Sequence, residues 1–82
     1  MNIEIKDTLI LDDNNEYVVT SKTIYENNNY YFLIDKNDPD NIIICKENNN
    51  ELIQVTNNEL INKLSPIFLE TTYNVLKEDN NQ

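Results

Sequence analysis

The sequence predicts an α+β protein, in which an antiparallel β-meander of four to five strands is followed by a C-terminal amphipathic helix packed on one face of the sheet. Short apolar runs alternate with polar clusters through residue 55, and the apolar spacing then changes from the period of a strand to that of a helix. We expect one domain, residues 1–82, with strands at about 3–55, a helical region at about 57–77 and a frayed tail at 78–82.

The expected strands are the runs "TLIL", "EYVVTSKTIY", "YYFLI", "NIIIC" and "ELIQV", all rich in residues that favour strands. The first has one buried face, because one parity carries its apolar residues Ile3, Ile5, Leu9 and Leu11, interrupted by Asp7. The second run changes phase near Ser21 and Lys22, which indicates a bulge or bend. "YYFLI" and "IIIC" are apolar on both faces, which is typical of strands that are central or covered on both sides.

The separators "DDNN", "ENNN", "KNDPD" and "KENNN" are predicted to be turns rather than ligand sites. The chain has no glycine, and asparagine is then the residue best able to enter the left-handed backbone region that tight turns require. Connections this short join antiparallel neighbours and cannot hold parallel crossovers.

Helical spacing begins near residue 57 and continues for about twenty residues. The predicted stripe consists of Leu60, Ile61, Leu64, Ile67, Phe68, Thr71, Thr72, Val75 and Leu76. Thr56 and Glu59 have the spacing of a capping box. Pro66 removes one helical hydrogen bond, whereas Ser65-Pro66 is also a favourable helix start, so we expect either one kinked helix or two helices at 57–64 and 66–77.

The formal net charge of -9 bounds the partners. Such a charge repels phosphate backbones and anionic lipids, so we expect no direct binding to nucleic acid or membrane, and a basic protein surface is the best electrostatic match. Alternatively, the acidity only keeps a small protein soluble. No apolar run is long enough to span a bilayer and the N-terminus lacks signal-peptide features, which favours a cytoplasmic location.

The sequence does not supply a nucleophile paired with a base. The chain has no histidine to activate Cys45, which we interpret as a core residue, and no glycine for a phosphate-binding loop. The segment "DKNDPDN" is superficially similar to a calcium loop. However, Pro39 occupies the fifth position, and Lys46 stands where such a loop has its bidentate glutamate. We therefore expect a non-catalytic protein without cofactor or metal.

The order of the runs "EYVV", "YYFLID", an Asp/Asn-rich loop, an isoleucine strand, "NNNELI" and an acidic helix resembles the YrzB-like family of small acidic bacterial proteins, a domain of unknown function. The resemblance spans roughly residues 7–77. The sequence departs from the family pattern at Asn14 and Asn15, where the family has a turn glycine, and at Pro66. The resemblance implies the meander and helix but no site residues.

In an up-and-down meander, alternate turns lie at the same end of the sheet, so "LDDNNE" and "DKNDPD" should meet. This acidic end is a candidate partner-binding site formed by Asp12, Asp13, Glu16, Asp35, Asp38 and Asp40. Solvated turn carboxylates and a weak divalent-cation site are the alternatives. A weaker candidate is an aromatic sheet face with Tyr17, Tyr25 and Tyr31, which would also suit a homodimer. Core packing is the favoured alternative for most of these rings.

Two functions are compatible with these features. The first is a small interaction or regulatory module that binds protein. The second is a phage or mobile-element inhibitor, similar in action to an anti-CRISPR protein, that mimics nucleic acid and blocks a basic groove on a host nucleic-acid-binding protein. The residues do not identify the partner.

Overall fold

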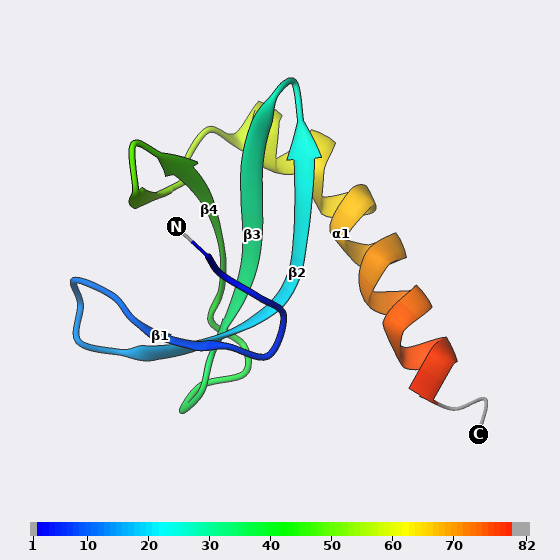
Figure 1. Cartoon of the computed structure of the whole chain (residues 1–82), viewed down its shortest axis with the longest axis horizontal. Helices are drawn as coiled ribbons and strands as arrows, with labels where there is room; N and C mark the ends of the chain where they lie inside the picture. The colour runs from blue at the N-terminus through cyan, green and yellow to red at the C-terminus, as the bar shows by residue number, and fades with distance from the viewer. Residues whose placement is uncertain (1, 80–82) are drawn as a thin grey trace.

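The computed structural model describes the backbone of residues 2–79 and the side chains of residues 2–70. Its elements, in chain order, are β1 (Thr8–Ile10), β2 (Glu16–Tyr25), β3 (Asn28–Asp35), β4 (Ile42–Asn48), β5 (Glu51–Gln54) and α1 (Asn58–Asp79). All strand pairs are antiparallel, and the order in the sheet is β1-β2-β3-β4-β5 (Figure 1). The predicted meander is therefore confirmed, with five strands.

Two hairpins close through two-residue turns that have no glycine. Glu26 and Asn27 connect β2 to β3 with φ values of 49° and 66°, and Asn49 and Asn50 connect β4 to β5 with φ values of 52° and 66°. Two consecutive positive φ angles are typical of the turn whose twist matches that of the flanking strands. The prediction that the asparagine tracts form turns is confirmed at both hairpins.

A β-bulge in β2 reverses which residues face each side of the sheet. Val19 pairs with Leu33 but Ser21 pairs with Phe32, so Thr20 is the extra residue. The Thr20 hydroxyl donates a hydrogen bond to the Phe32 carbonyl oxygen at 3.0 Å. The predicted change of phase in this run is confirmed.

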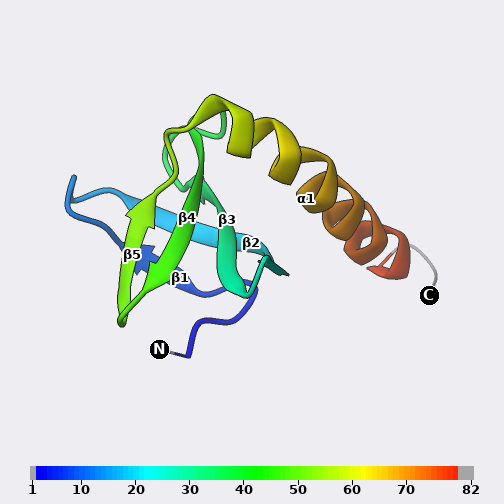
Figure 2. The same cartoon turned by 90° about the horizontal axis from the view of Figure 1, so that it is seen from above.

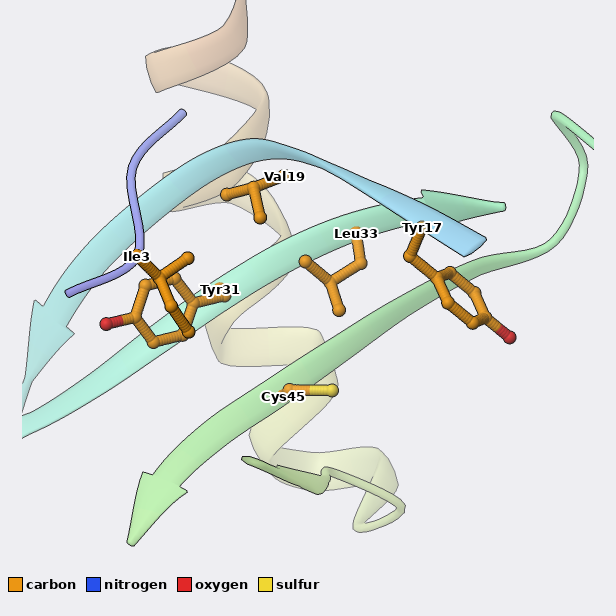
Figure 3. Packing of buried hydrophobic residues seen from close by; sticks show 6 residues of the cluster. All are labelled: Ile3, Tyr17, Val19, Tyr31, Leu33 and Cys45. Atoms are coloured by element: carbon orange, nitrogen blue, oxygen red, sulfur yellow. The ribbon is translucent and has the colours of Figure 1, made fainter. Parts of the chain in front are cut away.

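The sheet curls around one of its faces, which we call the inner face. Its buried cluster consists of Ile3, Tyr17, Val19, Tyr31, Leu33 and Cys45 (Figure 3). Leu9 from β1 and Leu52 from β5 both contact this cluster, although these strands are at opposite edges of the sheet. One cluster therefore joins the two edges, which is possible only because the sheet curls.

The opposite face, which we call the helix face, carries a second cluster formed by Tyr30, Ile44, Val55, Leu64 and Phe68. Phe68 of α1 stacks on Phe32 of β3 with 5.2 Å between ring centroids. The N-terminal half of α1 runs beside the sheet, and its C-terminal half extends beyond it (Figures 1 and 2). Because β3 and β4 contribute side chains to both clusters, their two-faced apolar pattern is explained.

The first strand is shorter than its alternating pattern predicts. Strand pairing includes only Thr8–Ile10, and a turn precedes it, in which Lys6 has a φ of 80°. The Asp7 carboxylate accepts a hydrogen bond from the Glu4 N–H at 2.9 Å, and the Asp7 N–H donates to the Glu4 carbonyl oxygen at 3.1 Å. Asp7 therefore ends the strand, while Ile3 still reaches the inner cluster through a non-strand segment.

The helix begins one residue later than the capping box predicts. Asn57, not Thr56, is the N-cap, because its side-chain oxygen accepts a hydrogen bond from the Leu60 N–H at 3.1 Å. The Asn57 carbonyl oxygen accepts the first helical bond, from the Ile61 N–H, at 3.0 Å. Asparagine is at least as good an N-cap as threonine, so the local preference does not favour Thr56.

The predicted alternative of two helices separated at Ser65-Pro66 is wrong, because α1 runs continuously from Asn58 to Asp79 with Pro66 inside it. The Ser65 hydroxyl donates to the Ile61 carbonyl oxygen at 2.7 Å and does not cap a new helix. An interior proline costs about 3 kcal/mol. Burial of Leu64 and Phe68, which flank Pro66 and are both 0% exposed, contributes a similar amount, about 1.5–3 kcal/mol for each side chain.

The C-terminal predictions are tested only in part. Residues 78 and 79 belong to α1, so the frayed tail does not begin at 78. Residues 80–82 and the side chains of Thr71, Thr72, Val75 and Leu76 lie outside the described residues.

Candidate functional site

The β1–β2 turn and the β3–β4 loop meet at one end of the sheet, as the meander predicts. The Tyr17 hydroxyl donates a hydrogen bond to the Asp13 carboxylate at 2.8 Å and accepts one from the Asn41 side-chain amide at 3.3 Å. Tyr17 lies at the start of β2, Asp13 in the turn before it and Asn41 in the loop before β4. The hydroxyl of one tyrosine therefore connects both acidic segments.

Asp35 shapes this end from the interior. Its side chain is only 5% exposed. The carboxylate accepts hydrogen bonds from the Asn37 N–H at 2.8 Å and the Asn41 side-chain amide at 3.1 Å, and its carbonyl oxygen accepts one from the Asp38 N–H at 3.3 Å. Asp35 therefore organises the β3–β4 loop, and the structure places it away from the surface to which sequence reasoning assigned it.

Two further acids stabilise the turns while remaining exposed. The Asp13 carboxylate accepts a hydrogen bond from the Asn15 N–H at 2.9 Å as well as the one from Tyr17. Both bonds lower the pKa of Asp13 below its ordinary value of 3.8, and the bond from the Asn15 N–H has the larger effect. The hydrogen bond to Asp13 raises the pKa of Tyr17. Asp38 accepts a hydrogen bond from the Asp40 N–H at 3.2 Å.

The remaining acidic side chains at this end differ in whether a lysine lies close to their negative charge. Glu16 lies 3.5 Å from the ammonium group of Lys36, an exposed pair of small energetic value. The Asp12 and Asp40 side chains are exposed, and among residues 2–70 neither carboxylate is in a hydrogen bond or ion pair. The structure therefore holds several exposed carboxylates beside one lysine.

The predicted aromatic face is largely internal. Tyr17 is 2% exposed and Tyr31 is 4% exposed, and both belong to the inner cluster. Burial, with a smaller contribution from Glu47, raises the pKa of Tyr31. Tyr25 is half-buried on the helix face, where its ring packs edge-on against that of Tyr30 with 6.5 Å between ring centroids. These three rings therefore do not form one exposed patch.

Among the residues that the structure describes, Cys45 and the groupings of metal-binding residue types bear on the sequence predictions about catalysis and metals. Cys45 is 1% exposed, and burial raises the pKa of its thiol to about 11, so the interpretation of Cys45 as a core residue is confirmed. In this part of the chain, no three residues of the types that bind metals lie close enough to share an ion.

A groove that sequence reasoning missed lies between the β1–β2 turn and the β4–β5 hairpin. It has a volume of about 310 Å³ and is lined by Ile10, Leu11, Asp12, Asp13, Ile43, Cys45, Leu52 and Gln54. Only the curl of the sheet brings these two segments together. The parity of Leu52 in "ELIQ" is the only local signal that could have indicated it.

Comparisons with known proteins do not assign the chain to a family: no family model, curated protein or solved structure matches it. Within the described part of the chain, no helix has the length and apolar content that crossing a bilayer requires.

Proposed function

We propose that this protein is a small, acidic, non-catalytic interaction module that binds a basic protein surface through its acidic end. The proposal is carried by one observation. Tyr17 connects the β1–β2 turn to the β3–β4 loop, so the exposed carboxylates of both segments belong to one end of the sheet. A cytoplasmic setting and membership of the YrzB-like family are part of the same proposal.

The hydrogen bonds in these two segments matter for binding, because part of the binding free energy is lost when a partner must immobilise flexible side chains. Asp13 and Asp38 are already held by hydrogen bonds within their own turns, so a partner does not have to immobilise them. A surface rich in Lys or Arg would relieve the mutual repulsion of these carboxylates. Association should therefore be fast at low ionic strength and weaken as salt rises.

An inhibitor that mimics nucleic acid is the second candidate. The observation that favours it is the concentration of carboxylates on two adjacent connections, with Lys36 as the one lysine among them. Such a surface suits a groove that normally holds phosphates. In this case the partner is a nucleic-acid-binding protein, and DNA or RNA competes with the protein for it.

The experiment compares two variants that each lose four negative charges. The first combines Asp12→Asn, Asp13→Asn, Asp38→Asn and Asp40→Asn. Each asparagine keeps one side-chain oxygen, which can still accept the turn hydrogen bonds from the Asn15 and Asp40 N–H groups. At position 13 an amide nitrogen replaces the second oxygen, which accepts from Tyr17 in the unmodified protein. The matched control combines Glu26→Gln, Glu51→Gln, Glu59→Gln and Glu70→Gln, which are exposed acids outside the acidic end. Each protein is used to capture partners from a lysate of the organism that carries the gene.

We expect the unmodified protein and the control variant to retain the same partner, and the acidic-end variant to lose it. Elution should be complete as salt rises from about 50 to about 300 mM, because screening shortens the electrostatic range. Release by added DNA or RNA would assign the inhibitor function. Equal capture by both variants would overturn the proposal.

In this proposal the helix is part of the scaffold. We propose that α1 remains docked on the helix face as an amphipathic helix that bends at Pro66. Leu64 and Phe68 support docking because both are fully buried with residues of β3 and β4. A pair of spin labels placed before and after Pro66 would measure the bend, and a straight-helix distance would contradict it.

A further inference from the structure

The curled sheet is left open between its two edge strands. β1 and β5 lie at opposite ends of the strand order and do not pair with each other, yet Leu9 and Leu52 contact the same inner cluster. The groove described above occupies this opening, with Leu11 on one side and Leu52 on the other. One additional strand could therefore extend the sheet from β5 towards β1.

The hydrogen-bonding pattern of β5 shows which backbone groups face the opening. The β4–β5 hairpin has a two-residue turn, so the flanking residues Asn48 and Glu51 form a hydrogen-bonded pair. Alternation then directs the N–H and C=O groups of Leu52 and Gln54 away from β4. The Val55 N–H donates a hydrogen bond to the Ile44 carbonyl oxygen at 2.8 Å, as this alternation requires for the residue after Gln54.

These outward groups form an unpaired edge. Among the described residues, no backbone group is hydrogen-bonded to Leu52 or Gln54 on that side, and β5 is the outermost strand (Figure 2). An exposed row of N–H and C=O groups is a template for another strand. Addition of a peptide strand to such an edge is a common mode of recognition.

The groove beside this edge determines which strand fits. Leu11, Ile43 and Leu52 make its wall apolar, Asp12 and Asp13 lie at its rim, and no lysine lines it. The best occupant has apolar side chains directed into the groove. The basic side chains at its alternate positions face away from the groove and complement the net negative charge of the chain. A second copy of this chain is a poorer occupant, because each copy carries a net charge of -9.

We infer that the open edge of β5 binds an extended segment of a partner protein in which apolar residues alternate with Lys or Arg, in antiparallel pairing with Leu52 and Gln54. This inference rests on the proposed function and adds how the basic partner is held. Charges at the acidic end attract the segment, and backbone pairing with β5 orients it.

The probe is a synthetic peptide of nine residues that alternates lysine and valine. In antiparallel pairing, valines opposite Leu52 and Gln54 direct their side chains into the groove and their N–H groups towards β5. The first control peptide carries N-methyl groups on its valines, which blocks this pairing without changing charge. The second has glutamate in place of lysine.

Titration of the ¹⁵N-labelled full chain is followed by NMR. We expect the lysine–valine peptide to shift the amide signals of Leu52 and Gln54 and to slow their exchange with solvent. N-methylation should weaken binding about tenfold or more, because it removes the backbone N–H donors that would pair with β5. The glutamate peptide should not bind. Asp12→Asn should weaken binding several-fold, and the exposed helix variant Glu70→Gln should leave it unchanged.

Two results would overturn the inference. One is equal binding of the N-methylated peptide, or shifts confined to another surface. The other is self-association of the protein through β5 in sedimentation experiments, which would assign the edge to a second copy. If capture from lysate depends on the acidic end but the peptide leaves β5 unaffected, the proposed function stands and strand addition fails. If the peptide protects β5 while the acidic-end variant retains its lysate partner, strand addition stands and the proposed function fails.

Discussion

The two faces of the sheet are closed in different ways. On the inner face, residues from an N-terminal segment and from β2, β3 and β4 form one cluster, and both edge strands curl onto it. On the helix face, closure depends on one added element, of which Leu64 and Phe68 are the fully buried side chains. The comparison teaches that the central strands of a short chain can contribute side chains to two hydrophobic clusters. The inner cluster depends on the curl of the sheet, whereas the cluster on the helix face depends on the docking of α1.

The largest effect is expected from removing the anchor of the helix face. Phe68→Ala should reduce the free energy of unfolding by about 3–5 kcal/mol, because the ring is 0% exposed and stacks on Phe32. That is a large part of the 5–15 kcal/mol typical of a small domain. Urea unfolding measures it, and an unchanged midpoint would mean that α1 does not stabilise the sheet.

The matched change on the inner face is Leu33→Ala. We expect a loss of about 2–5 kcal/mol, since Leu33 is 0% exposed in the middle of the central strand. Because Leu33 and Phe68 belong to different clusters, the two losses should be nearly additive in the double variant. A strongly non-additive result would show that the clusters behave as one core.

A smaller effect tests how the helix is started. Asn57→Ala should cost about 1 kcal/mol, because it removes the side-chain acceptor of the Leu60 N–H. The neighbouring Thr56→Ala is the control and should be nearly neutral. Thermal unfolding of both variants distinguishes them, and the reverse order would restore the capping box that the sequence predicts.

We expect the stability that the Asp13–Tyr17 contact provides to depend on pH. Asp13 has a lowered pKa in the folded state, so the stability that its hydrogen bonds provide is present above its ordinary value of 3.8 and is lost as pH falls through the lowered value. Tyr17→Phe removes one of these bonds. We expect its melting temperature to be lower than that of the unmodified protein at pH 7, and the difference to shrink in acid. A difference independent of pH would exclude Asp13 as the partner that matters.

The smallest perturbation uses Cys45 as a probe of inner-face closure. A thiol with a pKa of about 11 is almost entirely protonated at pH 8, and this one is also 1% exposed. Iodoacetamide should therefore label the folded protein far more slowly than the protein in urea. Equal rates would show that the groove beside β5 opens readily to the core.

Local chemistry was sufficient to predict that the asparagine tracts form turns, but not which residues of each tract occupy the turn positions. The letters "ENNN" occur twice. In the first copy the turn residues are Glu26 and Asn27, and in the second they are Asn49 and Asn50. Register decides this, because a shift of one residue would move the apolar side chains of β3 or β5 to the opposite face.

Sequence reasoning placed the two acidic segments at the same end of the sheet, as the structure has them, and misjudged the surroundings of individual residues. Chain order and short connections placed the β1–β2 turn beside the β3–β4 loop. They could not show that Asp35 is buried as an acceptor for Asn37 and Asn41, or that Tyr17 is internal. Burial of a polar group depends on which partners the fold brings within hydrogen-bonding distance, and those partners are distant in sequence.

The sequence by itself determined the strand order, which tracts form turns and the approximate position of the helix, because periodicity, turn residues and connection length act over a few residues. Only the tertiary structure decided that α1 continues through Pro66, since burial of Leu64 and Phe68 offsets the lost helical bond. The tertiary structure also decided that the sheet curls enough for Leu9 and Leu52 to share one cluster and leave a groove beside β5. Curl arises from twist summed over five strands and from a bulge at Thr20, and no short stretch of sequence contains that sum.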